Sequence, residues 1–374
     1  MRRSIRCALP FMLAVFFFGS FTVAQKAPKH KTENIFLVMT DGLRWQEVFR
    51  GAELQRLEKY SKDAPVVDAL KKTYWRETPE ARRETLMPFV WNVLAKKGQL
   101  YGNRDKGSDA YVTNGLNFSY PGYSETLCGF ADPRVNSNDK VANPNVTVLE
   151  WLSRKPAYKG RIAAFSAWDV FPSIFNSERA GFPVSSGYDP FTLLTGNPRI
   201  ELLNILKKET PHYWDEEPFD ALPFRTALEY LKERKPRVLF LSLGETDDWA
   251  HGGNYQQYLD AAHRADDFLR ILWETAQSMP QYRDHTTLIF LTDHGRGNGD
   301  TTWSDHGGDE IPESKYIWMG FLGPDTAALG ERSKIGPVTQ NQVAATLSGL
   351  LGEDYGHEVH QAGPPVADAL PAGK

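Results

Sequence analysis

Short segments that are apolar at nearly every position recur along the chain. They are NIFLVMTD (34–41), RIAAFSAW (161–168), RVLFLSLGETD (237–247), TLIFLTDHG (287–295) and YIWMGFLGP (316–324). Apolar runs this short are typical of strands whose two faces are both buried, which is the usual situation in a parallel sheet. The pattern therefore predicts a buried, mostly parallel sheet.

Between these segments the apolar positions recur every three or four residues, which indicates amphipathic helices. The helical segments are 85–98, 146–155, 224–235, 255–277 and 339–352. The last of them begins with the capping-box pair Thr339 and Gln342 and ends at Gly352. Strands that alternate with helices predict an α/β fold in which helices cover both faces of a mostly parallel central sheet.

Three stretches depart from this alternation. Residues 51–84 are highly charged, and residues 171–218 contain many Pro, Gly and aromatic residues. We expect loop-rich insertions there, which either cover an active site or are ordinary surface excursions. The composition of residues 361–374 predicts a disordered tail. Residues 25–360, including the insertions, are expected to form one catalytic domain.

The N-terminal segment bears on location. Basic residues precede an apolar run and a small residue, Ala24, so residues 1–24 are predicted to be a signal peptide and the protein to be periplasmic or secreted. The apolar run is shorter than the ~20 residues of a spanning helix, and no later stretch predicts a membrane span. An uncleaved N-terminal anchor is the alternative.

Cys128 has no partner cysteine after the signal segment, so no intrachain disulfide is expected. The net charge of −4 and the absence of long basic runs give no nucleic-acid-binding footprint.

Three of the predicted strands end in an acid, namely Asp41, Asp247 and Asp293. In an open α/β sheet, ligands bind beyond the carboxyl ends of the strands, so these acids are candidate site residues. A single acid at a strand end more often caps the next helix. Three of them, two with a histidine close by in the sequence, favour a site.

Histidines accompany these acids. His251 follows Asp247 by one helical turn, His294 is next to Asp293, and His306 lies in a glycine-flanked loop. Histidine and carboxylate ligands without cysteine suit Zn²⁺, and Mn²⁺ or Mg²⁺ less tightly. Two such ions about 3.5–4 Å apart are the arrangement that clamps a phosphoryl group during its displacement.

Ser119 is the candidate nucleophile. It precedes Tyr120-Pro121 and a predicted helix at 122–128. A hydroxyl at a helix N-terminus lies near free backbone N–H groups, which favour a bound phosphate, and a coordinated metal would activate it. The alternative is that Ser119 only caps this helix.

Taken together, these residues resemble the alkaline phosphatase superfamily, and more narrowly its nucleotide pyrophosphatase/phosphodiesterase branch. The resemblance rests on five motifs in the same order over residues 34–310: Asp41 at a strand end, SYPGYSETLCG (119–129), DDWAHGG (247–253), TDHG (292–295) and SDHGG (304–308). It implies an alkaline phosphatase-like fold and two metal sites. One site would be held by Asp41, Ser119, Asp293 and His294, and the other by Asp247, His251 and His306.

Other positions are less well defined by the resemblance. The branch usually has Thr where this chain has Ser119, which leaves the preference for mono- or diesters open. Its downstream asparagine, near the oxygens of the transferred group, has two candidates here, Asn136 and Asn138. Arg44 could contact a phosphate oxygen, although a surface ion pair is the alternative. Asp305 is expected to orient His306.

The sequence therefore predicts a hydrolase that cleaves small-molecule phosphate mono- or diesters with two divalent metal ions, Zn²⁺ or alternatively Mn²⁺, and a phosphoryl-serine intermediate. A sulfatase-like esterase is the first alternative, although SYPGY lacks the arginine of the sulfatase motif. A non-catalytic metal-binding protein of the same fold is the second. His263, His357 and His360 have no partner at metal-ligand spacing and are expected to be structural.

Overall fold

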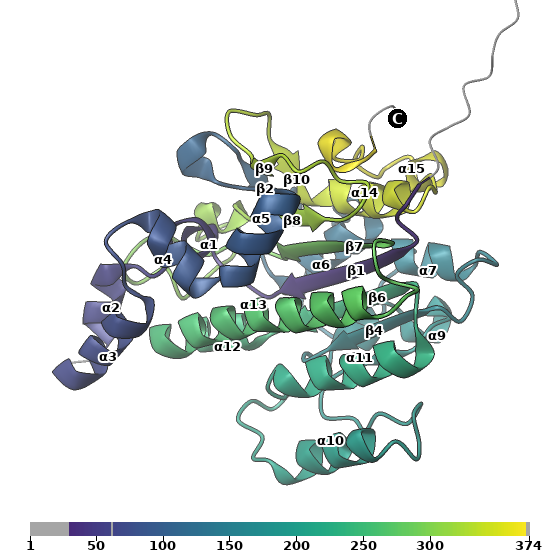
Figure 1. The fold of residues 1–374 in the computed structure, drawn as a ribbon, viewed down its shortest axis with the longest axis horizontal. Helices are drawn as coiled ribbons and strands as arrows, with labels where there is room; N and C mark the ends of the chain where they lie inside the picture. Colours follow the sequence, from purple (N-terminus) through teal and green to yellow (C-terminus); the bar gives the residue numbers. More distant parts are fainter. Residues whose placement is uncertain (1–29, 61–62, 372–374) are drawn as a thin grey trace, which may run out of the picture.

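The computed structural model describes residues 30–60 and 63–371, so the predicted signal segment 1–24 lies outside the described residues. Its main sheet has the strand order β5-β4-β6-β1-β7-β8-β2-β9 (Figure 1). The strands are β1 (Asn34–Thr40), β2 (Gln99–Tyr101), β4 (Ile162–Ser166), β5 (Val184–Ser185), β6 (Val238–Leu243), β7 (Thr286–Thr292), β8 (Met319–Leu322) and β9 (Gly330–Glu331). A separate pair contains β3 (Ala110–Tyr111) and β10 (Val338–Thr339).

The centre of the sheet is parallel, as predicted. β1 pairs with β6 on one side and with β7 on the other, and β4 continues the parallel order beyond β6. Each residue of β1 is buried, with Phe36 and Val38 facing one layer of the core and Ile35 and Leu37 the other. This two-sided burial explains why the strand is apolar at nearly every position.

One part of the sheet differs from the uniform pattern. β8 corresponds to the predicted strand at 316–324, and it runs antiparallel to β7 and to the short strand β2. The sequence pattern did not indicate β2. Its residues are all buried, so its hydrophobic pattern is the same as that of a central parallel strand. The direction of a strand depends on the segment that connects it to the preceding strand. Here the loop from 293 to 318 connects β7 to β8 without a crossover helix.

Helices cover both faces of the sheet. The longer ones are α3 (Ala64–Tyr74), α4 (Pro79–Leu86), α6 (Ser119–Cys128), α10 (Pro198–Glu209), α11 (Ala221–Arg234), α13 (Tyr255–Ser278) and α14 (Val343–Leu350). The shorter ones are α1 (Trp45–Arg50), α2 (Leu54–Tyr60), α5 (Ala95–Lys97), α7 (Val148–Ser153), α8 (Phe171–Ile174), α9 (Ser177–Ala180), α12 (Glu245–His251) and α15 (Tyr355–Glu358). In Figure 1, α11 and α13 lie in front of the sheet, while α6 and α7 lie behind it.

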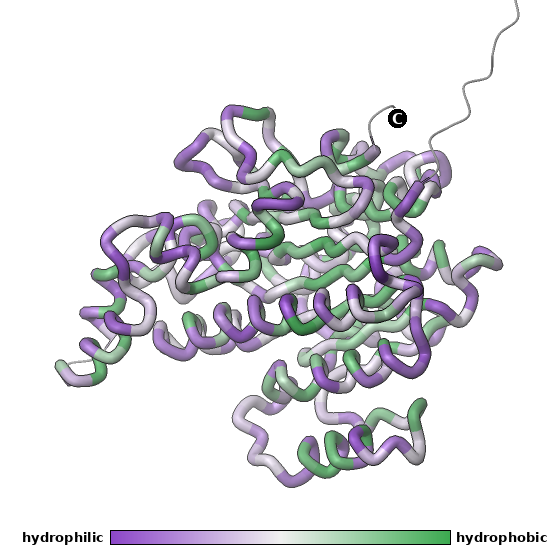
Figure 2. The backbone as a smooth tube through the Cα atoms, viewed as in Figure 1, coloured by the Kyte–Doolittle hydropathy of each residue, from purple (hydrophilic) through white to green (hydrophobic). Residues whose placement is uncertain are grey.

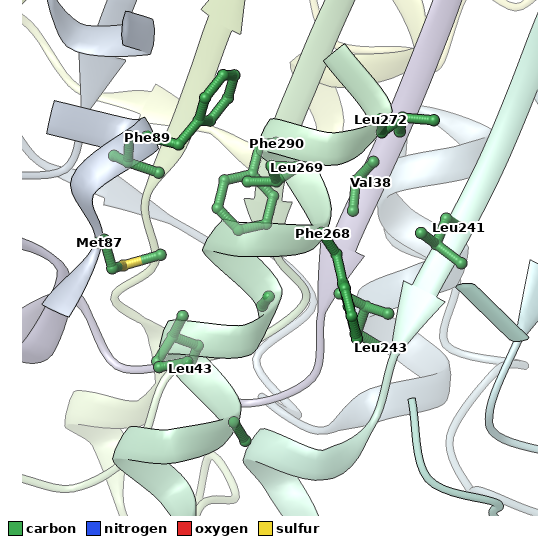
Figure 3. Close-up of a cluster of buried hydrophobic side chains, with 14 of the residues drawn as sticks. Val38, Leu43, Met87, Phe89, Leu241, Leu243, Phe268, Leu269, Leu272 and Phe290 are labelled. Atoms are coloured by element: carbon green, nitrogen blue, oxygen red, sulfur yellow. The ribbon is translucent and has the colours of Figure 1, made fainter. Parts of the chain in front are cut away.

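The core between α13 and the sheet is closely packed. Phe268, Leu269 and Leu272 of α13 lie over Val38, Leu241 and Phe290 of the three central strands (Figure 3). The Phe268 ring also stacks on Phe224 of α11, with 4.1 Å between ring centroids. The face opposite is filled by residues of α6, α7 and α14. The central strands are thereby held rigidly between two helical layers, which fixes the positions of their carboxyl ends.

The predicted helix at 85–98 is not continuous. α4 ends at Leu86, and Pro88 cannot donate a backbone hydrogen bond. The chain continues as a π-helix, Val90–Leu94, and as α5. The carboxylate of Asp266 accepts the N–H groups of Phe89 and Val90, which supports this new helix start.

The two expected insertions contain more regular structure than their composition predicted. Residues 51–84 form α2, α3 and most of α4, and residues 171–218 contain α8, α9, β5 and α10. The N-terminus of α10 is capped by the Asn197 side chain, which accepts from the N–H groups of Arg199 and Ile200.

The structure also corrects the expected disorder of the tail up to residue 371. Val366 and Ala369 are buried there, and the N–H of Val366 donates to Thr346 Oγ1. Within the described part of the chain, no helix is long and apolar enough to span a membrane.

Candidate metal centre

Three neighbouring strands bring the predicted acids to one edge of the sheet. Asp41 follows β1 directly and Asp293 follows β7 directly, while Asp247 lies in the first turn of α12, just after β6. Because β6, β1 and β7 are adjacent and parallel, their carboxyl ends meet. The convergence follows from the topology of the sheet rather than from proximity in sequence.

The first group of candidate ligands is buried. Donor atoms of Asp41, Asp293 and His294 all lie within 4.8 Å of one another. His294 Nε2 is 3.2 Å from Asp41 Oδ1 and 3.6 Å from Asp293 Oδ2. Asp293 Oδ1 accepts the N–H groups of Gly42 and His294, whereas its Oδ2 is buried without a hydrogen-bond partner among the described residues. A buried carboxylate oxygen without a partner costs free energy, so this group fits a bound cation.

Ser119 lies at this group and does not cap its helix. Its Oγ is 3.3 Å from Asp41 Oδ1 and 3.4 Å from His294 Nε2. α6 begins at Ser119 itself, three residues before the predicted start, and the residue in the N-cap position is Phe118, which makes no side-chain cap. The hydroxyl of Ser119 is therefore directed at Asp41 and His294.

The second group is more exposed. His251 Nε2 is 3.2 Å from Asp247 Oδ2 and 3.0 Å from His306 Nε2. His306 Nε2 is in turn 3.7 Å from Asp247 Oδ1. The donor atoms of Asp247, His294 and His306 also lie within 4.8 Å of one another, so His294 stands between the two groups.

Backbone carbonyls orient two of the imidazoles. His294 Nδ1 lies 2.9 Å from Gly295 O, and His306 Nδ1 lies 3.2 Å from Asn117 O. A carbonyl oxygen can only accept, so each Nδ1 carries a hydrogen, and each Nε2 presents a lone pair when its ring is neutral. Both Nε2 atoms face the carboxylates. This orientation of histidine by a second hydrogen bond is typical of metal ligands.

The pKa shifts reflect burial and the crowded charges. Burial lowers the pKa of His251 and of His306, and the neighbouring His294 lowers both further, so these two rings are neutral at pH 7. Burial also lowers the pKa of His294, but the Asp293 and Asp41 carboxylates outweigh it and raise the pKa to about 9. Burial, reinforced by Asp41, raises the pKa of Asp293 well above its usual range. A positive charge among these acids is therefore favourable, as a proton or as a metal ion.

Arg296 is a site residue that the sequence analysis missed. It is fully buried and its guanidinium donates to the Asp247 carboxylate, to Gly42 O and to Ser304 O. Arg296 thus fixes the orientation of Asp247, while Oδ2 of Asp247 faces His251. The only available signal was its position two residues after His294.

Comparison with known proteins gives the family. The family model described as type I phosphodiesterase / nucleotide pyrophosphatase matches residues 49–345. The chain belongs to this family. It is therefore a hydrolase that acts on phosphoester bonds, in a family that depends on metal ions. No curated protein sequence gives a significant match to the chain.

Solved structures agree on the fold. Wild-type alkaline phosphatase PafA aligns over 92% of this chain and 100% of its own, with 10% identity and a TM-score of 0.54. The lipoteichoic acid synthase LtaP from Listeria monocytogenes aligns over 87% and 73%, with 11% identity and a TM-score of 0.55. Ps i-CgsB aligns over 89% and 75%, with 18% identity and a TM-score of 0.52. At these identities the likeness establishes the alkaline phosphatase-like fold alone.

Arg44 does not take the place expected of a phosphate ligand in this phosphodiesterase-family chain. It is fully buried, and its guanidinium pairs with Glu47 at 2.9 Å and with Glu53 at 2.5 Å and donates to Gly297 O. The surface ion pair is also corrected, because the pair with Glu47 is wholly buried. Arg44 instead ties the start of α1 to the loop that follows His294.

The two candidate asparagines differ in position. Asn138 Oδ1 accepts the N–H of Tyr120, the residue after Ser119, so Asn138 lies beside the start of α6. Asn136 is exposed and lines a small depression with Tyr120 and Arg134. Of the two, only Asn138 makes a hydrogen bond at the candidate nucleophile's segment.

The remaining acid and histidines also have defined places. Asp305 Oδ1 is 3.8 Å from Nδ1 of His251, so it lies nearest to His251 rather than orienting His306, whose Nδ1 faces Asn117 O. His263 Nδ1 donates to Leu86 O, a structural contact between α13 and α4. His357 and His360 are exposed.

Proposed function

We propose that this member of the type I phosphodiesterase family is an exported two-metal phosphoesterase that cleaves small phosphate mono- or diesters through a phosphoryl-serine intermediate. The observation that carries the proposal is the convergence of two ligand groups and one serine hydroxyl at the carboxyl ends of β6, β1 and β7. Export rests on the composition of residues 1–24 alone.

The residues present fit two divalent ions. Asp41, Asp293 and His294 would hold one ion together with Ser119, and Asp247, His251 and His306 would hold the other. Their nitrogen and oxygen donors suit Zn²⁺, with Mn²⁺ as the alternative. When bound, the ions would supply the positive charge that stabilises the phosphoryl group during transfer.

The chain's own residues then account for the steps. Ser119 Oγ attacks phosphorus and forms a new O–P bond, while the ester O–P bond breaks and the alcohol leaves. The N-terminus of α6, where Ser119 sits, adds backbone N–H groups and the positive end of the helix dipole on the side of the phosphoryl oxygens. Water then cleaves the phosphoryl-serine, releases phosphate or a phosphomonoester and restores the Ser119 hydroxyl.

Arg296 has a supporting role in this scheme. Its contacts with Gly42 O and Ser304 O hold the guanidinium in place, so that the Asp247 carboxylate keeps one orientation toward His251 and His306. A carboxylate fixed in this way loses less entropy on binding an ion than a free one. Arg296 is therefore a positioning residue.

One activity panel tests the proposal. The purified protein, with its Zn²⁺ and Mn²⁺ content measured, is assayed with p-nitrophenyl phosphate, bis-p-nitrophenyl phosphate and p-nitrophenyl sulfate. We expect about two metal ions per chain and turnover of one or both phosphate esters above that of the sulfate. Preferential turnover of the sulfate would favour a sulfatase-like esterase, and bound metal without turnover of any ester would favour a non-catalytic protein. Either result contradicts the proposal.

A further inference from the structure

α10 lies at the edge of the molecule, away from the metal centre. It is reached through the 171–218 segment and packs mainly on α11, and Figure 1 shows it as the outermost helix on that side of the sheet. Its sequence is PRIELLNILKKE. The helix is about 18 Å long at 1.5 Å per residue, which is enough for one helix-to-helix contact.

The side of α10 that faces the protein carries both apolar and polar residues: Ile200 is 1% exposed, and Leu203 is partly buried against the core. Polar side chains face the protein: Asn204 donates to Phe191 O and accepts from Phe191 N, and Lys207 Nζ donates to Asp189 O. Lys207 is only 2% exposed. These contacts complete the inner side of the helix, whose apolar stripe is thereby already covered by the protein.

The opposite side of α10 is apolar and uncovered. Leu202 is 55% exposed, Ile205 48% and Leu206 37%, and Leu193 in the preceding loop is 46% exposed. Figure 2 shows that the backbone of α10 includes several hydrophobic positions. Positions 202, 205 and 206 have the i, i+3, i+4 spacing of a helix stripe that packs against a partner. Single exposed leucines need no explanation, but a stripe at helical spacing indicates an interaction surface.

Charges beside this stripe decide between partners. Glu201 and Lys208 are both exposed, and neither makes an ion pair within residues 30–60 and 63–371. They are seven residues apart, so they lie on the same side of the helix, about 20° from each other. Arg199 and Glu209 add one charge of each sign. This balance does not suit an anionic membrane surface, which would require an excess of Lys and Arg.

We propose that the outer face of α10 is a dimerisation surface for a second copy of this chain, with the two α10 helices packed antiparallel about a two-fold axis. An axis beside residues 204 and 205 places Glu201 of each copy opposite Lys208 of the other. Leu202, Ile205 and Leu206 then interdigitate across the axis. The two symmetric ion pairs and the opposed helix dipoles make the face self-complementary, as a two-fold interface requires.

The surface does not depend on the proposed catalytic function. A contact built on one helix per copy is smaller than a standard interface, so we expect a reversible dimer with a Kd on the order of 10–100 µM. Sedimentation equilibrium of the full chain across that concentration range measures it. Ile205→Asp is expected to raise the Kd at least about tenfold, because it places charge in the centre of the apolar stripe. Ile205 is about half exposed, so the variant should retain the thermal unfolding midpoint of the parent.

A charge-swap series tests the pairing itself. Lys208→Glu sets two glutamates against each other at both ends of the contact and is expected to raise the Kd about tenfold. The double variant E201K/K208E restores opposite charges across the axis, and its Kd should return to within about threefold of the parent. Lys159→Glu, at an exposed lysine outside the face, is the matched control and should leave the Kd unchanged.

Three outcomes would overturn the proposal. The parent could remain monomeric at all concentrations, or it could form a dimer that Ile205→Asp does not weaken. The third is a parent that remains monomeric but co-sediments with phosphatidylglycerol vesicles in a way that Ile205→Asp abolishes, which would assign the face to lipid. Failure of the double variant to recover while Lys208→Glu weakens the dimer would reject the antiparallel arrangement.

Discussion

The Nε2 atoms of His251 and His306 lie 3.0 Å apart. His306 donates its Nδ1–H to Asn117 O, so its Nε2 presents a lone pair, and burial lowers the pKa of both rings. A neutral His251 can donate an Nε2–H to this lone pair, whereas with its hydrogen on Nδ1 both Nε2 atoms present lone pairs to one shared cation. Asp247, whose Oδ2 is 3.2 Å from His251 Nε2, completes a set of three donors that such a cation would satisfy.

His251→Ala is therefore expected to lower the bound metal by about one ion per chain after dialysis, because the more exposed site keeps only two donors. Elemental analysis measures the stoichiometry. His357→Ala removes an exposed histidine elsewhere and should leave the metal content unchanged. If both variants retain the parent's two ions, the second site is assigned wrongly.

Ser119→Ala removes the hydroxyl of the proposed nucleophile and adds no atoms that could clash with the site. Turnover of phosphate esters should fall at least about 10³-fold, since the covalent route is lost, while the fold and most of the bound metal remain. Steady-state kinetics and circular dichroism measure the two effects. Ser119→Thr keeps a hydroxyl at the same place and should retain measurable turnover. Parental activity in the alanine variant would rule out the phosphoryl-serine.

The strands and the acids at their ends could be predicted because the signal is local. A strand buried on both faces must be apolar along its length, and the first polar residue after β1 or β7 marks the edge of the sheet, as Asp41 and Asp293 do. The histidines next to these acids follow from the same argument. The family resemblance added the order of the motifs, and the family match is consistent with it.

The features that could not be predicted depend on contacts between distant segments. The hydrophobic pattern of β8 is that of a parallel strand, and only its neighbours show that it runs antiparallel. Arg44 and Arg296 are charged and would be expected at the surface, yet both are buried and donate to residues far away in sequence, Arg44 to Gly297 O and Arg296 to Asp247. Ala369 belongs to a Pro- and Ala-rich tail that packs onto α14 and the core beside it. Local composition carries none of this information.

Gly122 lies where α6 crosses the end of β7. A Cβ at this position would be 2.5 Å from Asp293 O, which is too close for two non-bonded atoms. We expect Gly122→Ala to reduce the free energy of unfolding by about 1–3 kcal/mol through overpacking, although alanine is the better helix former by about 1 kcal/mol. It should also lower metal binding, because relief of the clash moves Asp293 or Ser119. Urea unfolding and metal analysis test both effects.

The matched control is Gly336→Ala, at a position where a Cβ would meet open space. This variant should leave unfolding and metal content at the parent values. A Gly122→Ala variant as stable as the control would mean that α6 can shift away from the strand end at no cost, and the close approach would then have no role in placing Ser119.

Lys207 provides a pH dependence away from the metal centre. Burial lowers its pKa from 10.5 to about 8, although Asp189 opposes the shift. The unfolded chain therefore holds this proton up to higher pH than the folded chain, and the free energy of unfolding gains a contribution that rises between about pH 8 and 10.5. The contribution is complete above that window and is lost as the pH falls through 8. Below the window, the buried charge destabilises the fold by up to about 3 kcal/mol, from a shift of 10.5 to about 8.

Lys207→Met removes this titration while keeping the length of the side chain. At pH 7 the variant is expected to be more stable than the parent, by less than that 3 kcal/mol, because the hydrogen bond from Nζ to Asp189 O is also lost. The difference should shrink or change sign as the pH rises to 10, because the parent lysine becomes neutral and the variant has no corresponding gain. Urea unfolding of both proteins across this range, with Lys159→Met as an exposed control, measures the difference directly. A constant difference across the range would mean that Lys207 keeps its ordinary pKa and that its ammonium reaches water.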